Sequence, residues 1–420
     1  MIYVPFIYFS ILFIYIYTRN RFDVSAYITL LYVITSFFSI LIHNLDYQPL
    51  SRYNLSIIPT IVYCGLITLA IYPIYKFNSN SIKGISFRNN KFINIITYFY
   101  FFSFIILLIA YKDDIVFRFA FGDFAEMRGD DDLGLKRYPN IFEFFLLPIR
   151  AFASSSYIMI FIFFFSISFL RKTVFFNLIA IIGSLPVVLI GILGIDRSKS
   201  FYWIIILGLS MVFFWKYIDR NKKIKIIPIL STFMLLIVIY VAMVTNSRFG
   251  ERDTGNKGGV ITYAGQSYIN FCYFWDNFEN PDGLSTKYLF PATHHWIIGD
   301  YKGTVPYQQE LHLKTRKNPG VFYSYLGSFL VDSNKPGPLL FSILYLLLCR
   351  FAFRKKKDII RHERLFYIFL LLIIPACGTI LYIYTSYYMT FSIVLWIILL
   401  KFLDRGKREV LYADVTNSKD

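Results

Sequence analysis

The feature that most constrains the fold of this chain is a series of apolar segments, each about as long as a membrane-crossing helix. They occupy residues 2–18, 24–43, 54–75, 93–111, 149–170, 173–194, 200–218, 226–245, 337–353, 365–383 and 387–403. A helix needs about 20 apolar residues to cross a hydrocarbon layer roughly 30 Å thick. We therefore expect an all-α, polytopic membrane protein with about 11 transmembrane helices, forming a single integral membrane domain over residues 1–420. No small-residue cleavage site follows the first segment, which predicts a retained helix.

The basic residues are sorted along the chain in a way that orients these helices. The connections after every second helix are basic; they cover residues 19–23, 76–91, 171–172, 216–225, 350–364 and the segment from 401 onward. These connections hold 25 Lys and Arg against 8 Asp and Glu, whereas the rest of the chain holds 18 of each. The positive-inside rule then predicts that the N-terminus lies outside and the C-terminus inside. A soluble nucleic-acid binder has no reason to sort its charge like this, so we expect no nucleic-acid partner.

The same orientation turns the two long polar segments outward. Residues 112–148 form the predicted first outer loop and residues 246–336 the large outer loop, each carrying short interfacial helices. In the first loop, Asp130, Asp131 and Asp132 could hold a divalent cation or form a solvated acidic turn. The spacing fits no EF-hand, and no Cys or His spacing in the chain fits zinc, so we expect neither a metal nor a cofactor.

A short hairpin between the sixth and seventh segments places two cations on the outer side, against the general bias. Arg197 and Lys199 follow Gly194-Ile-Asp196 at the predicted start of a helix. Free N–H groups at a helix N-terminus favour an anion, and the cations would add to that preference. The alternative is an ion pair between Asp196 and Arg197 at the level of the lipid headgroups.

The large outer loop opens with a second group of charged side chains. Arg248, Glu251, Arg252 and Asp253 follow the eighth apolar segment on a glycine-rich stretch. Guanidinium groups on such a backbone are suited to bidentate capture of phosphate oxygens. A charged loop without a ligand is the alternative, and the spacing matches no P-loop.

Aromatic residues and a histidine pair dominate the middle of this loop. Residues 261–275 are rich in Tyr, Phe and Trp, with Tyr263 and Asn270 among them, and could form an interfacial helix. Its aromatic rings could serve as a membrane belt or as platforms for sugars. His294 and His295 lie beside Trp296, and either could act as a general base because histidine titrates near neutral pH.

Several short blocks carry a resemblance to a known family. They are Gly194-Ile-Asp-Arg-Ser198, Asn246-Ser-Arg-Phe249, the block 262–271, and Tyr325-Leu-Gly-Ser-Phe-Leu-Val-Asp332. Together with many helices and two outer loops, they resemble the Wzy-type polymerases of oligosaccharide repeat units in O-antigen and capsule synthesis. Asn334 stands where that family has glycine; Asn also tolerates left-handed backbone angles.

The resemblance implies a bacterial inner-membrane enzyme acting on the periplasmic face. Its substrate would be an undecaprenyl-pyrophosphate-linked oligosaccharide, and the growing glycan would move to the non-reducing end of the next lipid-linked unit. Membrane lipids, a chain-length regulator and a flippase would be its partners. The candidate residues for the pyrophosphate are Arg197, Lys199, Arg248 and Arg252; those for the base are Glu251, Asp253, His294 and His295; Tyr263, Asn270 and Asp332 would serve the substrate or the structure.

Other functions remain open from the sequence. An O-antigen ligase would use the same donor with a different acceptor. A transporter or flippase of the lipid-linked sugar would have internal repeats, broken helices and charges at mid-membrane, none of which is visible in the sequence. A structural membrane protein would have no need for cations at the outer hairpin.

Overall fold

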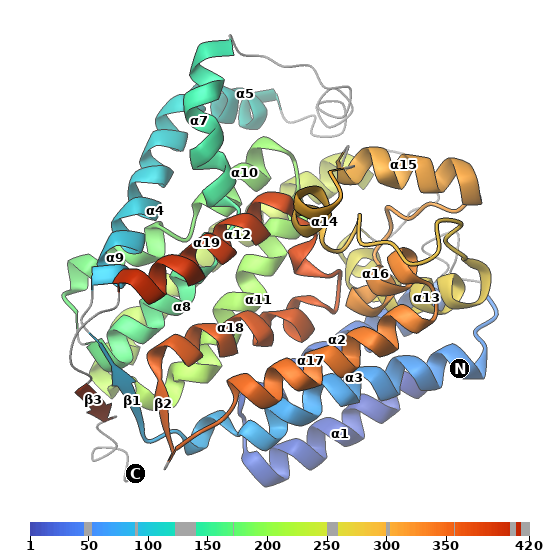
Figure 1. Ribbon diagram of the computed structural model, residues 1–420, viewed down its shortest axis with the longest axis horizontal. Helices are drawn as coiled ribbons and strands as arrows, with labels where there is room; N and C mark the ends of the chain where they lie inside the picture. The colour runs from blue at the N-terminus through green and yellow to red at the C-terminus, as the bar shows by residue number, and fades with distance from the viewer. Residues whose placement is uncertain are drawn as a thin grey trace. The chain divides into compact units, whose positions relative to one another are not determined.

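The computed structural model of this chain is mainly helical (Figure 1). The structure describes residues 1–45, 53–88, 91–121, 140–170, 172–249, 259–299, 303–356, 358–403 and 409–412. Helices occupy all eleven apolar segments that the sequence predicts. Among the described helices, six are long and apolar enough to cross a membrane, and a seventh is added if one bent pair counts as a single span. The helical, membrane-type fold class is thereby confirmed.

The chain divides into two compact units, each made from two separate stretches of sequence. Unit 1 combines residues 1–82 with 253–387. Its helices are α1 (Val4–Asn20), α2 (Val24–Leu45), α3 (Ile57–Phe77), α13 (Val260–Asn277), α14 (Pro291–Ile297), α15 (Thr304–Thr315), α16 (Ser324–Ser333), α17 (Pro336–Ala352) and α18 (His362–Cys377), with 3-10 turns at Ser79–Ser81 and Ile383–Thr385 and the short strand β2 (Ile359–Arg361).

Unit 2 combines residues 83–252 with 388–420. Its helices are α4 (Lys91–Ala110), α5 (Lys112–Phe121), α7 (Asn140–Ala153), α8 (Ile158–Phe165) with a π-helical turn at Ser166–Leu170, α9 (Val174–Ile182), α10 (Pro186–Leu193), α11 (Arg197–Phe214) with a 3-10 turn at Trp215–Tyr217, α12 (Arg220–Phe249), and α19 (Tyr387–Leu403), which begins at the boundary. Strands β1 (Gly84–Phe87) and β3 (Glu409–Tyr412) pair antiparallel. This small ribbon is an addition to the predicted all-α fold.

In unit 1, helix α13 packs closely against α2, and glycine makes the contact possible. A Cβ atom at Gly265 would lie only 2.4 Å from the carbonyl carbon of Phe38. The Ser39 hydroxyl of α2 donates a hydrogen bond to the Gly265 carbonyl oxygen. Small residues allow helix backbones to approach in this way. This contact fixes the first helix of the large polar segment onto an apolar helix of the bundle.

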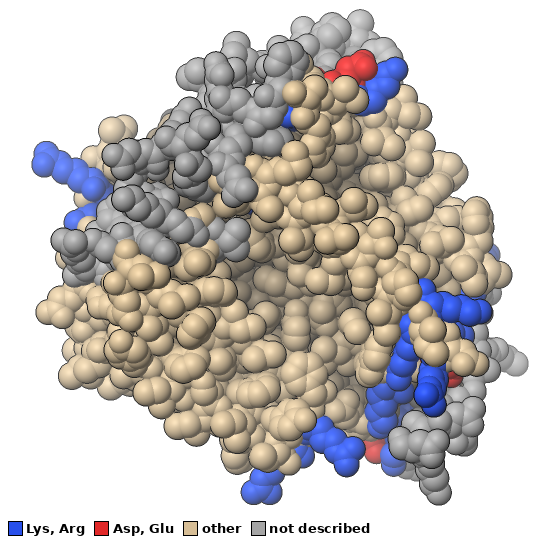
Figure 2. Space-filling view, turned by 180° about the vertical axis from the view of Figure 1, so that it is seen from behind, with Lys and Arg blue, Asp and Glu red and all other residues tan. Residues whose placement is uncertain are grey.

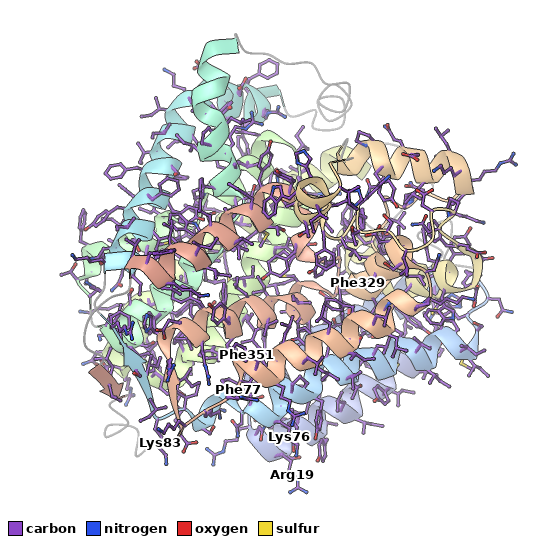
Figure 3. All side chains as sticks on the ribbon, in the orientation of Figure 1. Arg19, Lys76, Phe77, Lys83, Phe329 and Phe351 are labelled. Atoms are coloured by element: carbon purple, nitrogen blue, oxygen red, sulfur yellow. The ribbon has the colours of Figure 1, made fainter. Side chains whose placement is uncertain are left out.

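Packed aromatic rings hold the segment from 324 to 352 together and connect it to the rest of unit 1. Phe329 of α16, labelled in Figure 3, stacks on Phe341 of α17 with ring centroids 3.7 Å apart. Tyr382 contacts both rings edge-on, at 5.0 and 5.8 Å. Every residue of α16 from Ser324 to Asp332 is buried. α16 is therefore a short helix of the predicted large outer loop, but it lies in the core of unit 1 and not at an interface with lipid.

In unit 2, one predicted continuous span is sharply bent at a break, and a second is interrupted but still counts as one span. The run at 149–170 becomes Leu146–Ala153 and Ile158–Leu170, bent by 65°. A second break separates α9 from α10. Serine hydroxyls satisfy the backbone at both breaks: the Ser156 hydroxyl donates to the Ser184 carbonyl at 3.1 Å and accepts the Val187 amide at 3.0 Å. The inference from the sequence that broken helices are absent was therefore wrong, because serines inside an apolar run do not reveal a break.

The exposed surface fits a membrane protein. Figure 2 shows a broad face without acidic or basic side chains over its middle, with Lys and Arg gathered at its margin. Arg19 and Lys76, at the last turns of α1 and α3, lie at the same lower edge of unit 1 in Figure 3. Both cations lie over exposed or half-buried tyrosine rings, Arg19 over Tyr15 at 6.0 Å and Lys76 over Tyr72 at 5.7 Å. Such pairs are typical of the boundary between lipid tails and headgroups.

Candidate functional site

Part of the predicted site falls outside what the structure describes. Glu251, Arg252 and Asp253 lie outside the described residues, as do the three aspartates 130–132 of the first loop. Arg248 belongs to the last turn of α12, but its side chain lies outside as well. The second group of predicted cations therefore remains a prediction.

The outer hairpin has a different pairing from the one expected. Arg197 is only 2% exposed, and its guanidinium donates to the Thr245 hydroxyl of α12 at 2.8 Å. Asp196 caps α11 by accepting the Ser198 amide at 3.0 Å, and its other oxygen lies 3.7 Å from the Lys199 ammonium. The alternative of an Asp196–Arg197 pair is thus replaced by an Asp196–Lys199 pair. Arg197 instead contributes a buried positive charge to unit 2.

Helix α13 buries most of the aromatic side chains that could have served as sugar platforms. Tyr268, Phe271 and Phe274 are at most 1% exposed. Asn270 is also buried and donates to the Phe322 carbonyl at 2.8 Å, while the half-buried Tyr263 packs on the Phe322 ring at 4.8 Å. In the structure, Asn270 and Tyr263 therefore hold the segment that leads into α16.

The two adjacent histidines have opposite environments. α14 turns His294 inward, where it is 5% exposed, and leaves His295 exposed. Nδ1 of His294 lies 3.0 Å from the Thr286 hydroxyl, and its Nε2 is buried without a hydrogen-bond partner among the described residues. Nδ1 of His295 lies 3.2 Å from the Tyr387 hydroxyl. A proton on Nδ1 of His294 would be donated to Thr286 and would leave Nε2 as the basic atom.

Asp332 holds the turn that carries Thr286. The carboxylate is fully buried and accepts the amide N–H groups of Tyr288 at 3.4 Å and Leu289 at 3.1 Å. Its backbone carbonyl accepts the Ser285 amide at 2.9 Å. Burial raises the pKa of Asp332 above its usual range, and the hydrogen bond from Leu289 opposes this shift most. Asp332 is therefore a structural residue for the neighbourhood of His294.

A buried asparagine ties this neighbourhood together, and the sequence analysis missed it. The Nδ2 group of Asn280 donates to the carbonyls of Val331 at 3.0 Å and Asp332 at 3.2 Å and to the Tyr307 hydroxyl at 3.2 Å. Its Oδ1 accepts the Asp282 amide at 2.9 Å. The available signal was Asn280-Pro-Asp-Gly283, a turn sequence whose first side chain commonly bonds the backbone two residues on.

Asn280 is in turn hydrogen-bonded to Asn334, which follows Asp332 by two residues. Asn334 has φ 56° and ψ −164°, a conformation that favours glycine. Its Oδ1 accepts the Asn280 amide at 2.6 Å, and its Nδ2 donates to the Asn280 carbonyl at 3.3 Å. These two bonds offset the unfavourable backbone conformation. The turn after Asp332 therefore forms with asparagine.

His294 lines a pocket of about 470 Å³ on the surface of unit 1. Four charged residues share the lining: Asp282, Lys287, Glu310 and Lys314. Lys314 lies between the two carboxylates, 2.9 Å from Asp282 and 2.7 Å from Glu310. Ser285 and Thr286 add hydroxyl groups, and Leu284 and Ile298 add apolar side chains. The pocket thus combines a buried imidazole with hydroxyl, carboxylate and ammonium groups.

Comparisons with known proteins add no identification. No family model, no curated protein and no solved structure matches this chain. Within the described ranges, no group of three or more His, Cys, Asp or Glu side chains is placed to hold a metal ion. Any function must therefore be argued from the side chains around His294 and from the membrane character of the chain.

Proposed function

We propose that this protein is a lipid-linked glycan polymerase of the outer face of a bacterial inner membrane. It would transfer a growing glycan from undecaprenyl pyrophosphate to the non-reducing end of another lipid-linked repeat unit. The observation that carries the proposal is His294: a buried imidazole, adjacent to a single hydroxyl partner, lining a polar pocket in a chain of membrane-type helices. The resemblance of the short sequence blocks adds the substrate.

The topology of the proposal is the one that the charges predict. It has about 11 crossings, an outer N-terminus and an inner C-terminus, so that the segment 246–336 faces the periplasm. Sugar donors on that side are lipid pyrophosphates, which are already activated. The reaction needs a base for the acceptor hydroxyl and cations for the leaving group, and it does not need a nucleotide.

In the proposed reaction, the acceptor hydroxyl oxygen attacks the anomeric carbon of the donor sugar. The bond from that carbon to the pyrophosphate oxygen breaks, and the electron pair leaves with the lipid pyrophosphate. Nε2 of His294 takes the hydroxyl proton, and Nδ1–H donates to Thr286. Arg197, Lys199, Arg248 and Arg252 remain the candidates from the sequence for stabilising the departing diphosphate.

The test is reconstitution of the purified protein in liposomes with lipid-linked repeat units, read as a ladder on a gel. A positioned general base contributes about 10²–10⁴ in rate. We expect His294→Gln to lose ladder formation by that factor, while His312→Gln, an exposed histidine of the same segment, forms ladders normally. Ladders at the wild-type rate from His294→Gln would refute its role as the base. If His295→Gln alone were inactive, the base would be His295.

The cation assignment has its own test. We expect Arg197→Ala and Arg248→Ala each to abolish polymer while the protein remains in the membrane. Normal polymer length in both variants would remove these residues from the site. In cells, accumulation of a glycolipid with one repeat unit after gene deletion would indicate a polymerase, whereas a ligase would leave chain extension intact.

A transporter of lipid-linked sugars is the second candidate, because unit 2 contains broken helices of the kind that transporters use. The serine hydroxyls at the breaks are hydrogen-bonded within unit 2. Ser155 accepts the Ser392 hydroxyl at 2.6 Å, and Ser184 accepts the Trp203 ring N–H at 3.0 Å. Polar groups that satisfy each other leave less for a substrate. Movement of a fluorescent lipid-linked sugar across protein-containing vesicles, without any ladder, would favour this alternative.

A further inference from the structure

The pocket beside His294 has a charge balance that does not suit a diphosphate. Among the described residues of its lining, Lys287 and Lys314 accompany Asp282 and Glu310, so the formal charges of these four side chains cancel. Lys314 is already bonded to both carboxylates. A diphosphate carries several negative charges and would meet two carboxylates here, which repel it. The ligand that this lining favours is uncharged.

The lining also has the mixture of groups that a sugar ring requires. The carboxylates accept hydrogen bonds from hydroxyl groups, and the Ser285 and Thr286 hydroxyls can both donate and accept. Leu284 and Ile298, which are 74% and 61% exposed, offer apolar surface at the same pocket for the C–H face of a ring. The volume of about 470 Å³ falls within the range of small-molecule sites.

One residue of this lining also has an unsatisfied hydrogen-bonding atom. Nε2 of His294 has no partner among the described residues, although the residue is only 5% exposed. A buried polar atom without a partner is unfavourable, and native proteins rarely retain one without a reason. Because Nε2 is itself inaccessible, a ligand hydroxyl would reach it only after a shift of the His294 ring.

We propose that this pocket is a specificity site for an uncharged sugar residue of the acceptor glycan and excludes the donor's diphosphate. The inference rests on the proposed function for the identity of the ligand as the acceptor. The ligand class itself is argued from the charges, the hydroxyl groups and the apolar side chains of the lining. Asp282 and Glu310 select the sugar by accepting its hydroxyl groups. Lys314 holds both carboxylates in position.

Binding is measured first, without turnover, on the full-length protein in detergent by saturation-transfer NMR. The probes are methyl glycosides of glucose, galactose, mannose and N-acetylglucosamine, with inorganic pyrophosphate as the competitor. We expect at least one glycoside to bind and pyrophosphate not to displace it. Displacement by pyrophosphate, or binding of none of the glycosides, would overturn the inference.

Variants of the pocket residues test where the glycoside binds. We expect Asp282→Asn and Glu310→Gln each to weaken glycoside binding about ten-fold or more, as expected for hydrogen bonds to a charged acceptor. Glu279→Gln, an exposed carboxylate of the same segment that does not line the pocket, is the matched control. Leu284→Ala changes a side chain that is 74% exposed, so it tests the ring contact without disturbing the fold. Unchanged binding in all three pocket variants would place the sugar elsewhere.

Turnover then separates this inference from the proposed function. In reconstituted vesicles, Asp282→Asn and Glu310→Gln should raise the acceptor KM about ten-fold or more, with a smaller effect on kcat. Ladder formation with an unchanged acceptor KM would refute the pocket and leave the polymerase intact. Glycoside binding that the variants abolish, in a wild-type protein that forms no ladder, would leave the sugar site and refute the polymerase.

Discussion

Asn280 offers the sharpest test of how the neighbourhood of His294 is built. The side chain is 2% exposed, and its two N–H groups are shared among two backbone carbonyls and the Tyr307 hydroxyl, while its oxygen accepts one amide. Asn280→Ala removes about three hydrogen bonds, each worth about 1 kcal/mol net. We expect a loss of about 3 kcal/mol in the stability of this region, because the partners stay buried. Asn280→Asp should be worse, since it sets an acceptor against two carbonyl oxygens.

The natural cysteines of unit 1 provide the assay. Cys64, Cys272, Cys349 and Cys377 are all free and buried. A thiol-reactive dye modifies them only when the structure opens, and the rate follows the population of the open form when closing is fast. A loss of about 3 kcal/mol corresponds to about a 100-fold faster reaction at fixed temperature.

The matched control is Asn277→Ala, three residues earlier. Asn277 is exposed and donates to the Tyr53 hydroxyl at 3.3 Å and the Tyr273 carbonyl at 3.0 Å. Its replacement should change the reaction rate by less than about three-fold, as expected for a surface site. If Asn280→Ala reacts no faster than Asn277→Ala, the polar network does not stabilise unit 1 and the reasoning fails.

Three further outcomes follow from the same contacts. Gly265→Ala should prevent the close approach of α2 and α13 and reduce the yield of folded protein. Gly65→Ala, whose added Cβ would have no neighbour within 4 Å, should be tolerated or slightly stabilising. Size-exclusion chromatography in detergent measures both yields. Because burial raises the pKa of Asp332 above 3.8, the folded state binds its proton more tightly than the unfolded chain. The stability of the wild type relative to Asp332→Asn should therefore rise as the pH falls from neutral through that raised pKa, and it should level off below 3.8. The measurement is the difference in thermal midpoint between the two proteins as a function of pH. A difference that does not change with pH would contradict a buried carboxylate with a raised pKa. Thr286→Val should lower kcat in the ladder assay more than it changes KM, because it removes the hydroxyl partner of His294; an unchanged rate would show that Thr286 does not orient the ring.

The apolar segments predicted the positions of the helices because a span of lipid demands continuous apolar sequence. The helix boundaries followed within a few residues, as at 24–43 for α2 and 387–403 for α19. The breaks at Ala153 to Ile158 and between α9 and α10 were not predictable in this way. They depend on serines that meet partners distant in the sequence, as Ser155 meets Ser392. The division into two units was not predictable either, because each unit combines stretches that are distant in the sequence, and local periodicity does not show which stretches pack together.

The candidate site was predictable in its residue types and not in its pairings. The sequence pointed to His294 and Asp332, and both lie in one buried region of unit 1. Thr286 and Asn280 were missed because hydroxyl and amide side chains are common in loops, and only the folded chain distinguishes a buried pair from a solvated one. The sequence pointed to Arg197, but it did not reveal its hydroxyl partner Thr245, which is 48 residues away along the chain.

The two adjacent histidines show how the position of a residue around a helix decides whether its side chain is buried. Successive residues on a helix point about 100° apart, so on a helix with one exposed face a neighbouring pair can be divided between core and surface. In α14 that residue is His294, and His295 contacts Tyr387 at the surface. The charges of the described lining residues beside His294 cancel, which favours a hydroxyl-bearing ligand there. It follows that, in the proposed reaction, the diphosphate would be bound by cations outside this pocket, among which the sequence suggests Arg197, Lys199, Arg248 and Arg252.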